Sequence, residues 1–303
     1  MASTAQTRSV RYAFIAILAL LAMLIGFTGD KILPITVDED PVRNTATTPA
    51  PTKSPKDSPE PTQDPLASDP APPLLGAGDL RVVGGVIGDQ QKPADRLMKR
   101  WFADNGTGKS DSGFVSWAVA QLPAEPTTIQ RGTEQKTVKN LSSGSDAAGN
   151  RAADWLNEHG CEDVWLSFTT QQLALRSTSD AQPSVEEVKT VLKLAAEVAS
   201  GAQDRNGSPA ASQDEPCSGA DKPARSDCEC NYPSTQGTMA AAARSYLGGL
   251  SSYRYDQYAW MEQQVGLAAL YAGLELPSDV GAGALLGDLV GQYVLVTRGH
   301  AKP

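Results

Sequence analysis

The run VGAGALLGDLVGQYVLV, residues 280–296, decides the fold class. It is almost entirely apolar or small, and a glycine recurs every fourth residue from Gly283 to Gly291. This spacing places the glycines on one face of a helix, where a second helix can approach closely. Because Asp288 and Gln292 interrupt the apolar run, we expect the central helix of a helical bundle rather than a membrane span.

Helical signals continue outside this run. Pro183 precedes a capping box formed by Ser184 and Glu187, and apolar residues then recur at helical spacing. The sequence predicts further helices over residues 147–159, 162–175, 184–200, 235–250 and 256–273. Strand signals are confined to residues 80–87, where β-branched residues cluster but glycines interrupt them. We therefore predict a mainly α fold, a helical bundle.

The N-terminus predicts export and membrane attachment. Arg8 and Arg11 precede an uncharged stretch, residues 12–29, close to the ~20 residues that cross a bilayer as a helix. Basic residues before such a stretch favour a cytoplasmic N-terminus. We expect residues 1–11 in the cytoplasm, residues 12–29 as a signal anchor, and the remainder outside the cell membrane. A cleaved signal peptide is the alternative.

Composition divides the remainder into three parts. Residues 30–75 are rich in proline, threonine and serine, which predicts a disordered stalk. Residues 76–146 show no pattern that identifies a fold, and residues 147–303 form the predicted helical domain. The net charge of −9 argues against a nucleic-acid partner, because phosphate contacts need a basic face.

The four cysteines are candidates for disulfide bonds. An oxidising compartment favours two bridges. Cys228 and Cys230 are too close in sequence to bond each other without strain, so each is expected to bond Cys161 or Cys217. A zinc site is the alternative, although the histidines are not spaced to complete one. We expect no metal and no cofactor.

Two stretches resemble a known superfamily: NYPSTQGTMA at residues 231–240 and ALYAGLELPSDVGAGALLG at residues 269–287. They are similar to the second and third signatures of the type 2 phosphatidic acid phosphatase and vanadium haloperoxidase superfamily, in particular its soluble bacterial acid phosphatases. The similarity covers residues 147–295. It implies a helical bundle that hosts a phosphate site, and it implies which positions line that site.

At those positions the resemblance implies that catalytic residues have been replaced. Ser234 is retained, whereas Gln236 stands for the histidine that protonates the leaving group. Ala269 stands for a phosphate-binding arginine and Glu275 for the nucleophilic histidine. Asp279, which orients that nucleophile in the family, is retained. We expect these five residues to surround one cavity.

The first signature aligns loosely, with Gly201 for its lysine and Ser208 for its arginine. The family's chemistry needs two imidazoles, but His159 lies before all three signatures and His300 after them. Two carboxylates in the pocket would repel a phosphate. Cations from other positions could substitute; the candidates are Arg205, Lys222, Arg225 and Arg244.

The sequence therefore supports three hypotheses. The first is a membrane-anchored, extracytoplasmic domain that has lost catalysis and binds or scaffolds an unknown envelope ligand or protein. The second is an active phosphoric monoester hydrolase, or another hydrolase with a divergent carboxylate-based site. The third is a purely structural envelope protein.

Overall fold

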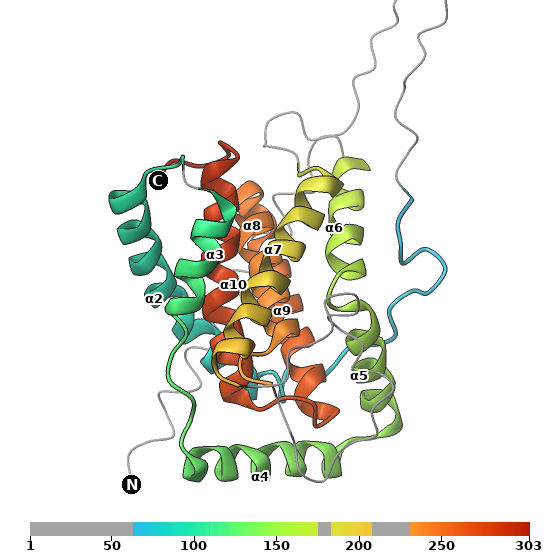
Figure 1. Cartoon of the computed structure of the whole chain (residues 1–303). Helices are drawn as coiled ribbons and strands as arrows, with labels where there is room; N and C mark the ends of the chain where they lie inside the picture. Colours follow the sequence, from blue (N-terminus) through green and yellow to red (C-terminus); the bar gives the residue numbers. More distant parts are fainter. Residues whose placement is uncertain (1–62, 109, 175–182, 208–230) are drawn as a thin grey trace, which may run out of the picture. The chain divides into compact units, whose positions relative to one another are not determined.

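The computed structural model describes residues 63–108, 110–174, 183–207 and 231–303, which all belong to one compact unit, Glu60–Pro303. These residues form nine α-helices and one 3-10 helix and contain no strand (Figure 1). The helices are α2 (Arg81–Asn105), α3 (Asp111–Ala120), α4 (Thr128–Gly144), α5 (Ala147–His159), α6 (Asp163–Ala174), α7 (Val185–Arg205), α8 (Thr235–Leu250), η1 (Ser252–Arg254), α9 (Tyr255–Tyr271) and α10 (Pro277–Thr297). The predicted mainly α fold is confirmed, and the predicted membrane segment 12–29 lies outside the described residues.

Helix α10 is the centre of the packing. It contacts α8, α2 and α7, and most of its residues are buried. Among the described helices it alone is long and apolar enough to cross a membrane, yet 89% of its most apolar window is buried inside the protein. This burial agrees with the prediction that residues 280–296 form a central helix.

The glycines of α10 let the backbone of α8 come close. A Cβ atom on Gly283 would lie 2.6 Å from the carbonyl oxygen of Ser234, and one on Gly287 would overlap the carbonyl oxygen of Thr238. On the facing surface of α8, Ala241 is fully buried, and an added Cβ on Gly287 would lie 2.7 Å from its Cβ atom. Small residues on both helices therefore set their close contact.

Most predicted helices have the expected bounds. Helices α5 and α8 begin and end where the sequence indicates, and α7 extends five residues beyond residue 200 to Arg205. At the start of α7, the Ser184 hydroxyl accepts a hydrogen bond from the Glu187 N–H at 3.0 Å, and Glu187 Oε2 accepts one from the Ser184 N–H at 3.3 Å. The predicted capping box is therefore confirmed.

The strand signal at residues 80–87 is wrong, because this segment is the start of α2. Val83, Ile87, Ala94 and Met98 are buried at helical spacing and face the core. The helical period is visible only over the length of α2. Within eight residues the β-branched cluster dominates, and packing against α10 overrides that local preference.

The last part of the predicted stalk is packed against the helices. Leu75 is buried, and its N–H and carbonyl both bond the side-chain amide of Gln264 at 2.9 Å. The prediction of disorder is therefore wrong for residues 63–75, whereas residues 30–62 lie outside the described part. Helices α2 and α3 also share one hydrophobic core with α5–α10, so residues 76–146 are part of the same domain.

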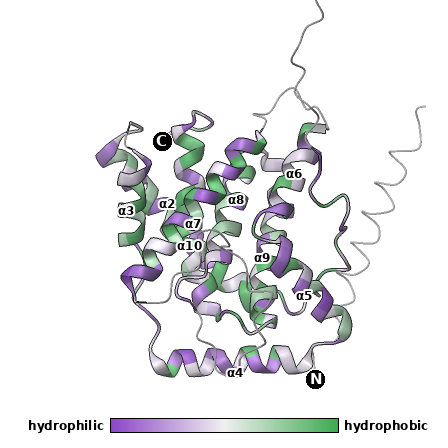
Figure 2. Ribbon diagram, turned by 45° about the vertical axis from the view of Figure 1, so that its right-hand side comes forward, coloured by the Kyte–Doolittle hydropathy of each residue, from purple (hydrophilic) through white to green (hydrophobic). Residues whose placement is uncertain are grey.

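Helix α4 differs from the others because it runs across the ends of α9 and α10 (Figure 1). Figure 2 shows few hydrophobic residues along it. Val138 is its one buried residue, and Ile129 is 84% exposed. A helix with so little buried apolar surface depends on polar contacts to hold its position.

Candidate functional site

Helices α8 and α10 begin at the same end of the core. Ser234 is the N-cap of α8, and its hydroxyl accepts a hydrogen bond from the Gly237 N–H at 2.9 Å. The Ser234 N–H donates to the carbonyl oxygen of Asp279, in the first turn of α10, at 3.0 Å. Because helix N-termini carry partial positive charge, this end of the pair favours negatively charged groups.

Asp279 is fully buried there and uses both of its carboxylate oxygens. Its Oδ1 accepts from Arg131 Nη1 at 2.6 Å, and its Oδ2 accepts from the Leu276 N–H at 2.9 Å. Leu276 occupies the N-cap position, so Asp279 lies at the third helical position and bonds back to the cap. Arg131 belongs to α4, and the ion pair therefore fixes α4 to the start of α10.

Glu275 lies beside this ion pair. Its Oε2 is buried and has no hydrogen-bond partner in the described part of the chain. Burial, followed by the charge of Asp279, raises the pKa of Glu275 well above its ordinary value, against opposing effects of Ser234 and Arg131. Burial also raises the pKa of Asp279 to about 6, although Arg131 lowers it. Both carboxyl groups therefore bind a proton more readily than an exposed carboxyl group does, and because they lie close together they titrate as a pair.

Gln236 and Ala269 make contacts elsewhere. The Gln236 amide nitrogen donates to the Leu156 carbonyl oxygen and to Asn157 Oδ1, both at 3.4 Å, which ties α8 to α5. Ala269 is fully buried, and its carbonyl oxygen accepts from the Leu274 N–H at 3.0 Å as α9 ends. Of the five positions that the resemblance implies, the structure thus brings together Ser234, Glu275 and Asp279.

The loosely aligned first signature does not join this cluster in the described residues. Gly201 lies in α7, where an added Cβ would be 3.2 Å from Val119 of α3. Ser208 lies outside the described residues, as do Cys217, Cys228 and Cys230. Cys161 is buried and is not a free thiol, but its predicted pairing stays a prediction.

Both histidines are paired with carboxylates away from the cluster. The ring nitrogens of His159 lie 2.9 Å from Asp69 Oδ2 and 2.8 Å from Asp163 Oδ2. His300 Nε2 lies 3.1 Å from Glu187 Oε1. In the described part of the chain, the hydrogen bonds of the two rings therefore go to Asp69, Asp163 and Glu187 rather than to Asp279 or Glu275.

Of the four candidate cations, the two in the described part of the chain, Arg205 and Arg244, contact other groups. Arg244 is buried, with Nε 2.7 Å from Glu262 Oε2 and Nη2 2.6 Å from Asp288 Oδ1, so it joins α8, α9 and α10 in the core. Arg205 donates to the Val119 carbonyl oxygen at the surface. Lys222 and Arg225 lie outside the described residues.

Sequence reasoning missed Arg131, the cation that does reach the cluster. It lies 148 residues before Asp279, in the region that resembles no family, and no local motif distinguishes it. Glu134, one helical turn later, accepts a hydrogen bond from the Ser278 hydroxyl at 2.6 Å. Two polar contacts thus hold α4 against the start of α10.

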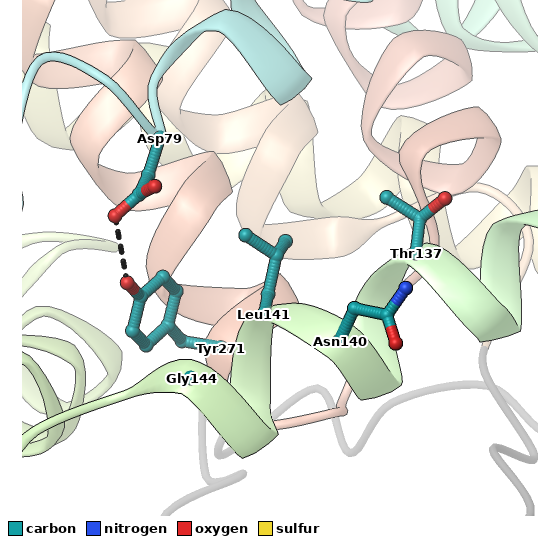
Figure 3. A pocket seen from close by; sticks show the side chains of 6 residues that line it. All are labelled: Asp79, Thr137, Asn140, Leu141, Gly144 and Tyr271. Atoms are coloured by element: carbon teal, nitrogen blue, oxygen red, sulfur yellow. Dashed lines mark hydrogen bonds between the residues drawn. The ribbon is translucent and has the colours of Figure 1, made fainter.

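A pocket of about 310 Å³ opens farther along α4 (Figure 3). It is lined by Asp79, Thr137, Asn140, Leu141, Gly144 and Tyr271. The Tyr271 hydroxyl donates to Asp79 Oδ2 at 2.8 Å, which joins two of its walls.

The described residues contain no group of three or more His, Cys, Asp or Glu side chains that could hold a metal ion. The chain matches no family model, and comparisons with curated proteins and with solved structures give no match. The arrangement at Asp279 is an ion pair with Arg131 beside Glu275, a buried carboxyl group whose pKa is raised.

Proposed function

We propose that this chain is a non-catalytic binding or scaffolding module built on a helical bundle of the phosphatidic acid phosphatase and haloperoxidase type. In this proposal, residues 12–29 anchor it in the cell membrane with the domain on the extracytoplasmic side. The observation that carries the proposal is the Asp279–Arg131 ion pair. It lies where the resemblance would place a phosphate and the histidine that attacks it.

The ion pair supports loss of catalysis for two reasons. Asp279 accepts one hydrogen bond on each oxygen, from Arg131 and from Leu276, so its position is fixed by contacts other than a histidine. Glu275 takes the position of the nucleophile, but burial raises its pKa well above the ordinary value, and a carboxyl group that favours its protonated form is a poor nucleophile. A phosphate would also have to compete with the Asp279 carboxylate for Arg131.

Hydrolysis of p-nitrophenyl phosphate by the purified full chain tests the proposal. We expect the wild-type chain and the Asp279→Asn variant to show the same rate as buffer from pH 5 to pH 8. Gln135→Ala is a matched control, because Gln135 is an exposed residue of α4. Wild-type turnover that persists in Gln135→Ala and disappears in Glu275→Gln and Asp279→Asn would refute the proposal.

One observation favours a second function, a hydrolase with a carboxylate-based site. Burial raises the pKa of Glu275 well above its ordinary value and that of Asp279 to about 6, and two neighbouring carboxyl groups whose pKa values differ can act as an acid and a base. This alternative predicts that the chain hydrolyses 4-methylumbelliferyl glycosides or phosphate and that Glu275→Gln abolishes the activity. Equal rates for wild type and Glu275→Gln on both substrates would exclude it.

A further inference from the structure

The pocket shown in Figure 3, here called the α4 pocket, joins three parts of the chain that are distant in sequence. Asp79 precedes α2, Tyr271 ends α9, and the other lining residues come from the C-terminal half of α4. The Tyr271 hydroxyl bonds Asp79, and the Ser142 hydroxyl donates to the Tyr271 carbonyl oxygen at 2.8 Å. Hydrogen bonds between its own walls therefore hold the pocket in shape before any ligand arrives.

The lining residues restrict the charge of a ligand. Asp79 is the one charged side chain among them. Burial raises the pKa of Tyr271, and the negative charges of Asp79 and Asp146 raise it further. One oxygen of Asp79 accepts from Tyr271, which leaves its other oxygen to accept a further hydrogen bond. The pocket therefore disfavours anions and favours groups that donate hydrogen bonds.

The remaining lining residues indicate a hydroxyl-rich ring. Asn140 is exposed, and its side-chain amide can both donate and accept hydrogen bonds. A hydroxyl group of a ligand can likewise do both, so the two groups can pair in either direction. Leu141 and the ring of Tyr271 supply apolar surface, against which the C–H face of a sugar ring can pack. The volume of about 310 Å³ is at the lower end of the range for ligand pockets, so it suits a ligand of one or two rings.

We propose that the α4 pocket binds one ring of a neutral, polyhydroxylated ligand, with Asp79 and Asn140 bonding its hydroxyl groups. This inference names a ligand class for the proposed binding module and rests on that proposal. The binding experiment does not depend on turnover. A failure to bind the ligand would contradict this inference alone, whereas phosphatase activity would contradict the proposed function.

Saturation-transfer NMR and titration of the full chain test the inference. The probes are methyl β-glucoside, which is neutral, glucosamine, which is cationic, and glucuronate, which is anionic. We expect binding of the neutral glycoside and no binding of glucuronate. Asn140→Ala should weaken glycoside binding by roughly 5- to 10-fold, the effect of about one hydrogen bond. Gln135→Ala, which changes an exposed amide on the same helix outside the pocket, should leave binding unchanged.

Three outcomes would overturn the inference. The first is no detectable binding of the neutral glycoside at millimolar concentration. The second is stronger binding of glucosamine than of the glycoside, which would identify an ammonium site instead. The third is glycoside binding that Asn140→Ala does not weaken, which would place the sugar elsewhere on the chain.

Discussion

Asp279 and Glu275 illustrate how neighbouring carboxyl groups divide one charge. Arg131 forms an ion pair with Asp279 at 2.6 Å and also lowers the pKa of Glu275. Burial and the charge of Asp279 outweigh this effect, so the pKa of Glu275 stays well above its ordinary value. The chemistry of this end of the core therefore depends on one residue of α4.

Replacing Arg131 by methionine should destabilise the domain. We expect a loss of about 2–3 kcal/mol, less than the ~3–5 kcal/mol for breaking a wholly buried pair, because Arg131 is 23% exposed and Asp279 can take a proton. Urea unfolding followed by circular dichroism measures this loss. Arg205→Met, which changes an exposed arginine, should cost less than about 0.5 kcal/mol. Equal costs for the two variants would contradict the role of the ion pair.

Each ring nitrogen of His159 lies within hydrogen-bond distance of a carboxylate. A neutral imidazole has a single N–H and can donate to one of them, whereas the protonated ring can donate to both. Burial disfavours its charged form, but the hydrogen bonds to Asp163 and Asp69 outweigh that effect and raise the pKa of His159. The protonated ring therefore links residues 63–75 to α5 and α6.

The stabilisation by His159 should depend on pH. Because its folded pKa is raised, the contribution is fully present below the unfolded pKa of about 6.5 and is lost as pH rises through the folded value. His159→Gln should cost at most ~1 kcal/mol at pH 5.5, since Asp69 is 58% exposed, and progressively less as the pH rises through the folded pKa. NMR titration of the imidazole signal that His159→Gln removes gives the pKa directly. A value at or below that of a free histidine would contradict this interpretation.

At the scale of the element, α8 and α10 pack closely because small residues line their contact surfaces. Glycines on α10 and alanines on α8 allow the two backbones to touch. Arg244, Glu262 and Asp288 then tie the same pair to α9 through buried ion pairs. The contact therefore combines close backbone packing with a fixed charge cluster.

Gly287→Ala should destabilise the domain by about 1–3 kcal/mol, because the added methyl group would overlap the backbone of α8. Gly85→Ala is the matched control, a helical glycine of α2 with no atom within 4 Å of an added Cβ. It should stabilise the domain by up to ~1 kcal/mol, since alanine favours helix more than glycine does. Thermal unfolding compares the two variants, and the same sign for both would contradict the packing argument.

At the scale of the molecule, the described residues from 63 onward form one unit with one hydrophobic core. Residues 63–75 belong to that unit, so any stalk is shorter than the composition predicts. The predicted membrane anchor, residues 12–29, lies outside the described residues and stays a prediction.

Deleting residues 12–29 should release the chain from membranes. We expect the full chain to sediment with membranes after an alkaline wash and to keep its N-terminal mass, because an uncharged segment of this length is stable in a bilayer. The deleted chain should remain in the supernatant. A full-length gene product that is soluble and has lost its N-terminal residues would identify a cleaved signal peptide instead.

Several helices were predictable because their signals are local. Each signal spans only a few residues. The capping box joins Ser184 to Glu187, and the glycines of α10 are spaced four residues apart. The start of α2 was mispredicted because eight residues are too few to separate a helical period from a β-branched cluster. Ser234, Glu275 and Asp279 were identified through a resemblance, and their convergence required the fold.

The sequence by itself determined the helical class, the ends of α5 and α8, and the scarcity of imidazole groups, because each of these is set by residue type and local spacing. Only the tertiary structure decided that Arg131 neutralises Asp279, that residues 63–75 pack on the helices, and that a pocket forms beside Tyr271. These features join residues that are about 90 to 190 positions apart. Such contacts exist only after chain folding has brought α4 and the segment before α2 to the ends of α9 and α10.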